Sequence, residues 1–253
     1  MDTMRVISLG WGVQSFTLAA MAALGELGQV DAVLHADTGH ERQATYNFIS
    51  KWTPWLEDHN IRVVYLSPCS AAVLVDKHGG VMIPAFTVTP AGRGQIHRQC
   101  TGDWKISPMR RWLQANRNKA QVELLIGISL DEFRRMRDSD VKYIQNSWPL
   151  IDKKMTRNDC VNWLKHHDLE VPSKSACTFC PFQSKSEWQD IMAQPQDKAE
   201  ALAADEYIRS KRPPYSLFIH PARVPLAEVD LRTDQQKGQL DLAEVECSGV
   251  CFL

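Results

Sequence analysis

The sequence predicts an α/β protein, with a parallel-sheet domain in residues 1–150 and a smaller, mainly helical, cysteine-containing region in residues 151–253. Two observations lead to this prediction. Short apolar runs alternate with stretches of helical spacing along the first 130 or so residues, and after about residue 150 the pattern becomes mainly helical. Strands that alternate with helices imply right-handed crossovers and a sheet covered on both faces.

The expected elements follow in chain order. Strands are expected over residues 5–9, 30–35, 61–66 and 122–128. Helices are expected over residues 13–27, 41–59, 105–118, 155–166 and 184–207. Residues 79–99 hold four glycines and two prolines, which predicts a long loop of a kind that is usually functional or mobile. The tail from residue 215 has a mixed pattern.

The bulk composition excludes several classes of protein. The 253 residues suffice for one large domain, or for one domain with a small appendage. A net charge of -1 gives no global electrostatic case for nucleic-acid or membrane binding. The sequence has no secretory signal and no apolar run long enough to span a membrane, which predicts a cytoplasmic protein. In that reducing compartment, seven cysteines favour metal or redox chemistry over structural disulfides.

Residues 8–15 (SLGWGVQS) lie between the first expected strand and helix, and we call them the phosphate loop. Glycines at 10 and 12 allow a tight turn that brings backbone N–H groups close to an anion. The first helical turn adds unpaired N–H groups and the positive end of the helix dipole. The loop is neither a Walker A motif nor GxGxxG, and a plain glycine turn is the alternative. The expected nucleotide contacts here are Ser8, Gly10, Trp11, Gly12, Gln14 and Ser15.

A polar cluster at the end of the second expected strand strengthens this prediction. It contains Asp37, Thr38, Gly39 and Glu41. Ligands bind at the carboxyl ends of strands in open α/β sheets. Asp37 and Glu41 would bind ribose hydroxyls or Mg2+, and the alternative for Asp37 is a cap on the next helix.

Several motifs that follow one another along the chain resemble those of the PP-loop superfamily, specifically its phosphoadenosine-phosphosulfate (PAPS) reductase-like, adenine nucleotide alpha-hydrolase-like branch. That branch includes sulfonucleotide reductases, ATP pyrophosphatases of DNA phosphorothioation and many phage-encoded members. The resemblance covers about residues 5–185. It is carried by the phosphate loop, Asp37-Thr38-Gly39, residues 98–111, 127–135, 148–151 and 175–181.

The resemblance implies ATP or adenylyl sulfate as the nucleotide, with Mg2+. It adds Lys105, Gly127 and Arg134 to the expected nucleotide contacts. Trp11 departs from the family pattern, because glycine is common at its position. A bulky side chain there would stack on the base or narrow the pocket.

The cysteines form a second set of candidates. Cys177 and Cys180 have the spacing of a chelating pair, which suits zinc, an iron–sulfur cluster or a redox dithiol. The resemblance implies a [4Fe–4S] cluster held by Cys177, Cys180 and Cys100, with zinc as the rival metal. Cys160 is the candidate fourth ligand, and its alternative is a small buried helix residue.

The C-terminal tail carries Glu246-Cys247-Ser248 and a further cysteine, Cys251. The first two residues resemble in part the Glu-Cys-Gly end of sulfonucleotide reductases, whose cysteine attacks the sulfonyl sulfur. Cys247 and Cys251 would form a disulfide, relay a persulfide or complete the metal site; the alternative is that they are tail cysteines without a role.

Basic residues concentrate in two places. Residues 93–119 hold seven Lys or Arg and one acid, Asp103, which suits a polyanion. Arg134, Arg135 and Arg137 form the second cluster. Arg134 is the residue expected to stabilise charge on the α-phosphate.

Three functions fit these residues. The first is an ATP pyrophosphatase-type enzyme that adenylates an acceptor, for iron–sulfur-dependent sulfur transfer to a nucleic-acid base or DNA backbone. The second is a PAPS or adenylyl sulfate reductase that uses Cys247. The third is a catalytically quiet nucleotide-binding subunit of a modification or defence complex. The expected catalytic residues are Ser15, Asp37, Arg134 and Cys247. Expected partners are a nucleic-acid acceptor, a sulfur donor such as a cysteine desulfurase, and a second copy of the chain.

Overall fold

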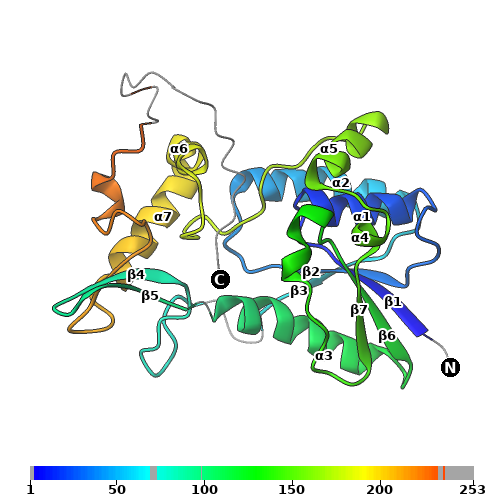
Figure 1. The fold of residues 1–253 in the computed structure, drawn as a ribbon, viewed down its shortest axis with the longest axis horizontal. Helices are drawn as coiled ribbons and strands as arrows, with labels where there is room; N and C mark the ends of the chain where they lie inside the picture. Colours follow the sequence, from blue (N-terminus) through cyan, green and yellow to red (C-terminus); the bar gives the residue numbers. More distant parts are fainter. Residues whose placement is uncertain (1–2, 69–72, 98, 233–235, 237–253) are drawn as a thin grey trace. The chain divides into compact units, whose positions relative to one another are not determined.

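The computed structural model describes residues 3–68, 73–97, 99–232 and 236 (Figure 1). The chain divides into two compact units, and each unit is built from two stretches of sequence. The first unit is Met1–Ala72 with Thr101–Ala176, and the second is Val73–Cys100 with Cys177–Leu253. The sequence predicts one boundary at residue 150, whereas in the structure the segment Val73–Cys100 groups with the C-terminal part.

The first unit contains a five-stranded sheet in which every described pair is parallel, as the sequence predicts. The strand order is β3-β2-β1-β6-β7. The strands are β1 (Thr3–Ser8), β2 (Ala32–Ala36), β3 (Val63–Leu66), β6 (Gln121–Ile126) and β7 (Ile144–Ser147). The chain moves outward from β1 to β3 on one side and then continues on the other side with β6. The order therefore reverses between β1 and β6. Edge strand β7 has the polar sequence IQNS, which explains why no apolar run predicts it.

Helices cover both faces of this sheet (Figure 1). They are α1 (Val13–Ala23), α2 (Gln43–Asp58), π-helix η1 (Thr101–Ile106), α3 (Ser107–Asn116), 3-10 helix η2 (Leu130–Arg135), α4 (Pro149–Asp152) and α5 (Arg157–His166). On one face, Ile7 and Val33 of the strands pack with Phe16 of α1, Leu56 of α2 and Leu164 of α5.

On the opposite face, Val6 and Leu34 pack with Leu113 of α3. Neighbouring strand residues thus point to opposite cores, as the twofold repeat of a strand requires. Both faces are closed by helices, which leaves the ends of the strands as the places where loops can form a site.

The second unit contains an antiparallel sheet of order β5-β4-β8. Its elements are β4 (Ala85–Thr89), β5 (Gly92–Ile96), α6 (Lys185–Ala193), α7 (Pro195–Ile208), β8 (Ser216–Phe218) and 3-10 helix η3 (Leu226–Glu228). The predicted long loop over residues 79–99 is therefore wrong. Within it, β4 and β5 form a hairpin that Gly92 helps to close at φ 131. Both strands are only five residues long, and the prolines and glycines around them predict a loop in place of strands.

Two further expectations are corrected in the second unit. The helix expected over residues 184–207 is two helices, because Pro195 lacks a backbone N–H and starts α7 anew. Strand β8 lies in the mixed tail. A buried carboxylate, Asp205, accepts hydrogen bonds from the backbone N–H groups of Ile219 and Leu226 and from Arg209. Within the described residues, no helix is long and apolar enough to cross a membrane.

Candidate functional site

The phosphate loop lies where the strand order reverses. It leaves the carboxyl end of β1, and Gly127 leaves the carboxyl end of the neighbouring strand β6. The turn at Asp37 leaves the carboxyl end of β2, on the other side of β1. Because parallel strands end at the same edge of the sheet, all three segments share that edge. In open α/β folds this is the position at which ligands bind.

The inner side of the loop is anchored by Trp11. Its side chain is 1% exposed and its ring centroid lies 6.1 Å from that of Phe16, 6.2 Å from Phe48 and 6.3 Å from His35. Its backbone is left-handed, at φ 58, which costs a non-glycine residue about 1–3 kcal/mol. The side chain therefore belongs to the core. The expectation that Trp11 stacks on a base is wrong for its side chain, although its backbone is part of the loop.

His35 lies directly beneath the loop and is buried. Its Nδ1 lies 3.1 Å from the carbonyl oxygen of Leu9, so the neutral tautomer with the proton on Nδ1 donates to that carbonyl. Burial lowers the pKa of His35 below its usual value. The Nε2 atom of His35 and the Nε1 atom of Trp11 are both buried without a described hydrogen-bond partner.

The outer side of the loop is closed by Ser15. Its hydroxyl accepts a hydrogen bond from the N–H of Gly10 at 3.2 Å and donates to the carbonyl of Gly12 at 3.2 Å. Gly12 is the N-cap of α1, and neither a side-chain cap nor an acidic residue in the first turn occupies this helix end. The first-turn N–H groups and the positive end of the helix dipole are therefore directed at the site, which suits a phosphate.

Gly127 is required for close packing against this helix start. A Cβ atom built on Gly127 would lie 2.7 Å from the backbone N of Ser15 and 2.9 Å from the carbonyl carbon of Gln14. Contacts that short do not occur, so any side chain would displace the loop. The resemblance implies that Gly127 contacts the nucleotide, and its observed role is to let β6 approach the loop.

Gln14 joins the loop to η2. Its Nε2 lies 3.3 Å from the hydroxyl of Ser129 and 3.2 Å from a carboxylate oxygen of Glu132. The Gln14 side chain therefore contacts η2, which leaves its backbone N–H, in the first turn of α1, as the Gln14 group available to a ligand. Helix η2 carries the exposed Arg134, whose guanidinium lies 5.9 Å from the Phe133 ring and makes no ion pair with a described residue. Neighbouring Arg135 pairs with Glu132 at 2.6 Å.

Asp37 forms the turn after β2. Its Oδ1 accepts hydrogen bonds from the N–H of Gly39 at 2.8 Å and from the hydroxyl of Tyr46 at 3.0 Å. Burial, followed by the nearby Asp37 charge, raises the pKa of Tyr46, which keeps it protonated as a donor. The N-cap of α2 is Arg42, so the helix-cap alternative for Asp37 is wrong. The Oδ2 atom has no hydrogen-bond partner among the described residues, and this carboxylate geometry fits a ribose hydroxyl or Mg2+.

Glu41 has a different role from the one expected. Its side chain is fully buried; one carboxylate oxygen pairs with Lys105 Nζ at 3.0 Å and the other accepts from the hydroxyl of Ser175 at 3.2 Å. With both oxygens engaged inside the protein, Glu41 does not bind ribose or Mg2+ directly. It instead holds Lys105, whose side chain is 36% exposed, in η1.

Two smaller contacts complete the predicted set. The hydroxyl of Ser8 donates to the sulfur of Met109 at 3.5 Å, so it is turned toward α3. Thr38 is buried, and its hydroxyl accepts from the N–H of His40 at 3.3 Å. Both residues shape the strand ends. Of the predicted polar side chains, Asp37, Lys105 and Arg134 are the ones best placed for a ligand.

The CxxC pair lies in a tight turn of the second unit. The N–H of Cys180 donates to the carbonyl of Cys177 at 3.0 Å, and the Gln183 amide donates to the same carbonyl at 3.2 Å. Thr178 and Phe179 between them are buried, while both cysteines are half-buried. Cys100 belongs to the same unit. In the part of the chain that the structure describes, no three metal-ligating side chains are grouped to hold an ion.

Cys160 is corrected from metal ligand to core residue. It lies in the first unit, is 0% exposed and packs in the apolar core formed with α1. Burial raises the pKa of its thiol to about 11, although a hydrogen bond with Thr17 acts in the opposite direction. The thiol is surrounded by apolar core side chains, and within the described residues no group of metal-ligating side chains forms around it, so this environment does not fit a ligand. Cys247 and Cys251 lie outside the described residues, as do Cys69 and Arg98.

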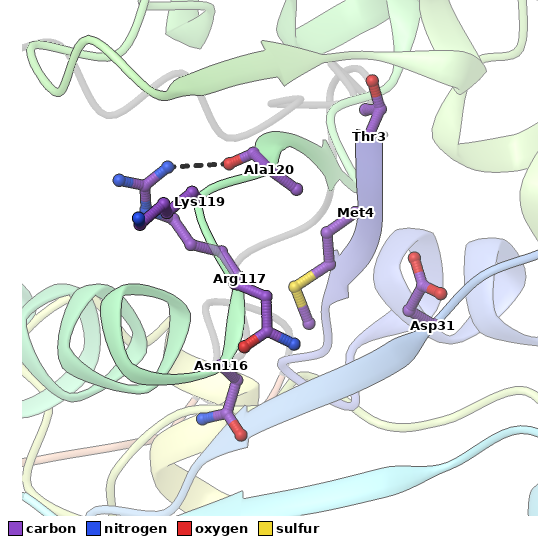
Figure 2. A pocket seen from close by; sticks show the side chains of 8 residues that line it. Thr3, Met4, Asp31, Asn116, Arg117, Lys119 and Ala120 are labelled. Atoms are coloured by element: carbon purple, nitrogen blue, oxygen red, sulfur yellow. Dashed lines mark hydrogen bonds between the residues drawn. The ribbon is translucent and has the colours of Figure 1, made fainter. Parts of the chain in front are cut away.

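A surface hollow of about 450 Å³ lies at the other edge of the sheet (Figure 2). It is lined by the start of β1, by Asp31 just before β2, and by residues 116–120 just before β6, where Arg117 donates to the carbonyl of Ala120 at 2.8 Å. This is the amino-terminal edge of the strands. Ligands of parallel sheets bind at the opposite edge, so we assign no role to the hollow.

No protein-family profile matches the chain, and no curated protein matches it in sequence. Among solved structures, it is similar to the phosphate complex of PAPS reductase from Candida auris, with 9% identity over 68% of this chain and 75% of that chain, at a TM-score of 0.44. It is also similar to the U34-tRNA thiolase NcsA from Methanococcus maripaludis with its [4Fe–4S] cluster. That match has 15% identity over 83% of this chain and 72% of that chain, at a TM-score of 0.40.

The parallel sheet with helices on both faces confirms the predicted fold class. The assignment of chemistry to this chain rests on the residues of the site.

Proposed function

We propose that this chain is an ATP pyrophosphatase-type enzyme that binds ATP at the phosphate loop and transfers AMP to an acceptor. One observation carries the proposal. The loop is held at the point where the strand order reverses, with Gly127 packed against Ser15 and an uncapped end of α1 behind it. Backbone N–H groups and a helix dipole in this position are suited to the phosphates of a nucleotide.

In the proposed reaction, an acceptor oxygen attacks the α-phosphorus of ATP. The bond between the α-phosphorus and the bridging oxygen breaks, pyrophosphate leaves with that electron pair, and the acceptor proton passes to solvent. Lys105 and Arg134 balance the charge that develops on the phosphates. Asp37 fits either the ribose or Mg2+, and a bound Mg2+ would neutralise the leaving pyrophosphate.

The finer part of the proposal is sulfur transfer to nucleic acid, and it rests on the sequence resemblance. Adenylation converts a poor oxygen leaving group into AMP, and a sulfur nucleophile then bonds to the acceptor as the bond to AMP breaks. The sulfur would come, as a persulfide, from a partner such as a cysteine desulfurase; a second thiol of that partner would then reduce the resulting S–S bond, which leaves the sulfur on the acceptor and a disulfide on the partner. Cys100, Cys177 and Cys180 are the residues that would hold a [4Fe–4S] cluster or zinc. Cys160 does not fit as the fourth ligand, so no step is assigned to the metal.

The test is to follow ATP labelled at the α-phosphate, with and without mixed RNA or DNA as acceptor. Release of AMP and pyrophosphate, or acceptor-dependent label on nucleic acid, supports the proposal. Ser15→Ala is expected to reduce it, and Ser50→Ala is the matched control, because Ser50 is exposed and bonds only to its own helix at Tyr46.

The alternatives predict other products. Sulfite formed from PAPS or adenylyl sulfate would identify a reductase that uses Cys247. Nucleotide binding without turnover would identify a quiet subunit. Release of ADP and phosphate would contradict cleavage at the α-phosphate.

A further inference from the structure

The phosphate loop contains a bulky residue where its backbone turn is tightest. Trp11 stands between two glycines, Gly10 and Gly12, and has a left-handed backbone at φ 58. Glycine adopts that conformation without strain, whereas tryptophan does so only if its surroundings hold it there. Contacts of the Trp11 side chain must therefore stabilise the left-handed backbone of the loop.

Three separate elements hold the indole of Trp11. Phe16 of α1 stacks on it with an interplanar angle of 26°, and Phe48 of α2 and His35 of β2 meet it edge to face. His35 also donates to the carbonyl oxygen of Leu9, two residues before Trp11. Core residues thus contact the loop at the Leu9 carbonyl and at the Trp11 side chain.

The outer side of the loop is comparatively unrestrained. Gly10 is exposed, and a Cβ atom built on Gly12 would meet nothing within 4 Å. On this side, the Gly10 N–H donates to the hydroxyl of Ser15 at 3.2 Å, and the Gly12 carbonyl accepts from that hydroxyl at 3.2 Å and from the N–H of Phe16 at 2.9 Å. Without the buried Trp11 side chain, these hydrogen bonds would have to order a turn that contains two flexible glycines.

We propose that Trp11 is a positioning residue, whose buried indole holds residues 10–12 in the turn that presents the loop N–H groups to the nucleotide phosphates. The expected consequence is tighter nucleotide binding, and this part of the inference rests on the proposed function. Glycine-rich segments lose much conformational entropy when they become ordered around a ligand. An indole fixed in the core removes that loss before the nucleotide arrives.

The test compares Trp11→Gly, which keeps the left-handed backbone accessible and removes the anchor, with Trp11→Phe, which keeps an aromatic ring. Leu56→Ala is the control for lost core packing, because Leu56 is fully buried in the same core and lies in α2 away from the loop. Two quantities are measured at a temperature where all the proteins are folded. They are hydrogen exchange of the amides of residues 10–15 and the dissociation constant for ATP.

Trp11→Gly is expected to exchange these amides roughly 10-fold faster and to bind ATP roughly 10-fold more weakly, which is about 1.4 kcal/mol. For Trp11→Phe, the dissociation constant for ATP should stay within about threefold of the native value, because the phenyl ring keeps part of the buried contacts that Trp11→Gly loses entirely. Leu56→Ala should lower the melting temperature and leave both loop exchange and ATP affinity unchanged. If Trp11→Gly does not fold, Trp11→Leu replaces it, because leucine keeps apolar burial without the ring contacts.

Native exchange at residues 10–15 in a folded Trp11→Gly protein would overturn the inference. The same effect on the loop in Leu56→Ala would overturn it too, because the cause would then be general loss of packing. A native chain that binds no ATP would remove the proposed function, yet the exchange measurement would still decide whether Trp11 orders the loop.

Discussion

Gly127 and Ser15 are packed so closely that no side chain fits between them: a Cβ atom on Gly127 would stand 2.7 Å from the backbone N of Ser15 and 2.8 Å from its Cα. Strand β6 and helix α1 therefore share the point at which the strand order reverses. The position of the phosphate loop depends on the absence of one methyl group in a segment far away in the sequence.

Gly127→Ala is the first prediction. The added methyl group meets backbone atoms, which cannot rotate away, so the loop or β6 must shift. We expect a loss of about 1–3 kcal/mol in the free energy of unfolding, together with weaker ATP binding. Urea denaturation and a nucleotide titration measure the two effects. Gly102→Ala is the control, because a Cβ atom there meets nothing within 4 Å; equal behaviour of the two variants would contradict the packing argument.

Ser15→Ala should weaken nucleotide binding with little change in the fold. The hydroxyl both accepts from Gly10 and donates to Gly12, so its removal frees the outer side of the loop. Two modest hydrogen bonds at a half-exposed site correspond to a loss of about 1 kcal/mol in stability. Isothermal titration with ATP is the measurement, and unaltered affinity would exclude the loop from the site.

Glu41→Gln tests the role assigned to the buried carboxylate. Glutamine keeps the shape of the side chain but leaves Lys105 without its charged partner. Because Lys105 is 36% exposed, we expect a loss of about 1–2 kcal/mol in stability, below the range for a fully buried pair, and reduced ATP affinity. The matched control is Glu170→Gln, which breaks an exposed ion pair with Lys51. That change should cost less than about 1 kcal/mol and leave ATP binding unaltered.

Acidification should destabilise the first unit through His35. Burial lowers the pKa of His35 below 6.5, so the unfolded chain takes up a proton at a higher pH than the folded chain does. This contribution to stability is fully present above about pH 6.5 and is lost as the pH falls toward the lowered pKa. Urea unfolding at about pH 7.5 and about pH 5.5 should show a smaller pH effect in His35→Gln. His97→Gln, at an exposed histidine, should behave as the native protein.

The cysteines give a prediction that separates metal ligand from core residue. In protein purified without oxygen, about four irons and four sulfides per chain would indicate a cubane cluster, and one zinc would indicate a structural site. Cys177→Ser should abolish the bound metal and any brown colour. Cys160→Ala should retain the metal and lower only the stability, since Cys160 lies in the apolar core. Loss of metal in Cys160→Ala would restore it as a ligand.

The sequence predicts the first unit better than the second. Strands β1, β2, β3 and β6 lie in the predicted apolar runs, with ends that differ by a few residues, because each of them contributes apolar side chains to a core of the first unit. Strand β7 is polar and lies at the edge, and β4 and β5 are five residues each, in a segment rich in glycine and proline. Pairing with neighbouring strands stabilises such short strands, and that pairing cannot be read from a short stretch of sequence.

What the sequence by itself determined is the α/β class, the loop after the first strand and the polar turn at Asp37, because glycine conformation, helix ends and apolar periodicity are local properties. What only the tertiary structure decided is which polar groups face a ligand. Trp11 and Cys160 carry polar or reactive atoms yet pack in the core, and Glu41 and Gln14 have their polar atoms bound by distant residues. The physical reason is that a polar group can bind a ligand only when it is exposed and its atoms are not already hydrogen-bonded within the protein. Both conditions depend on residues far apart in the chain.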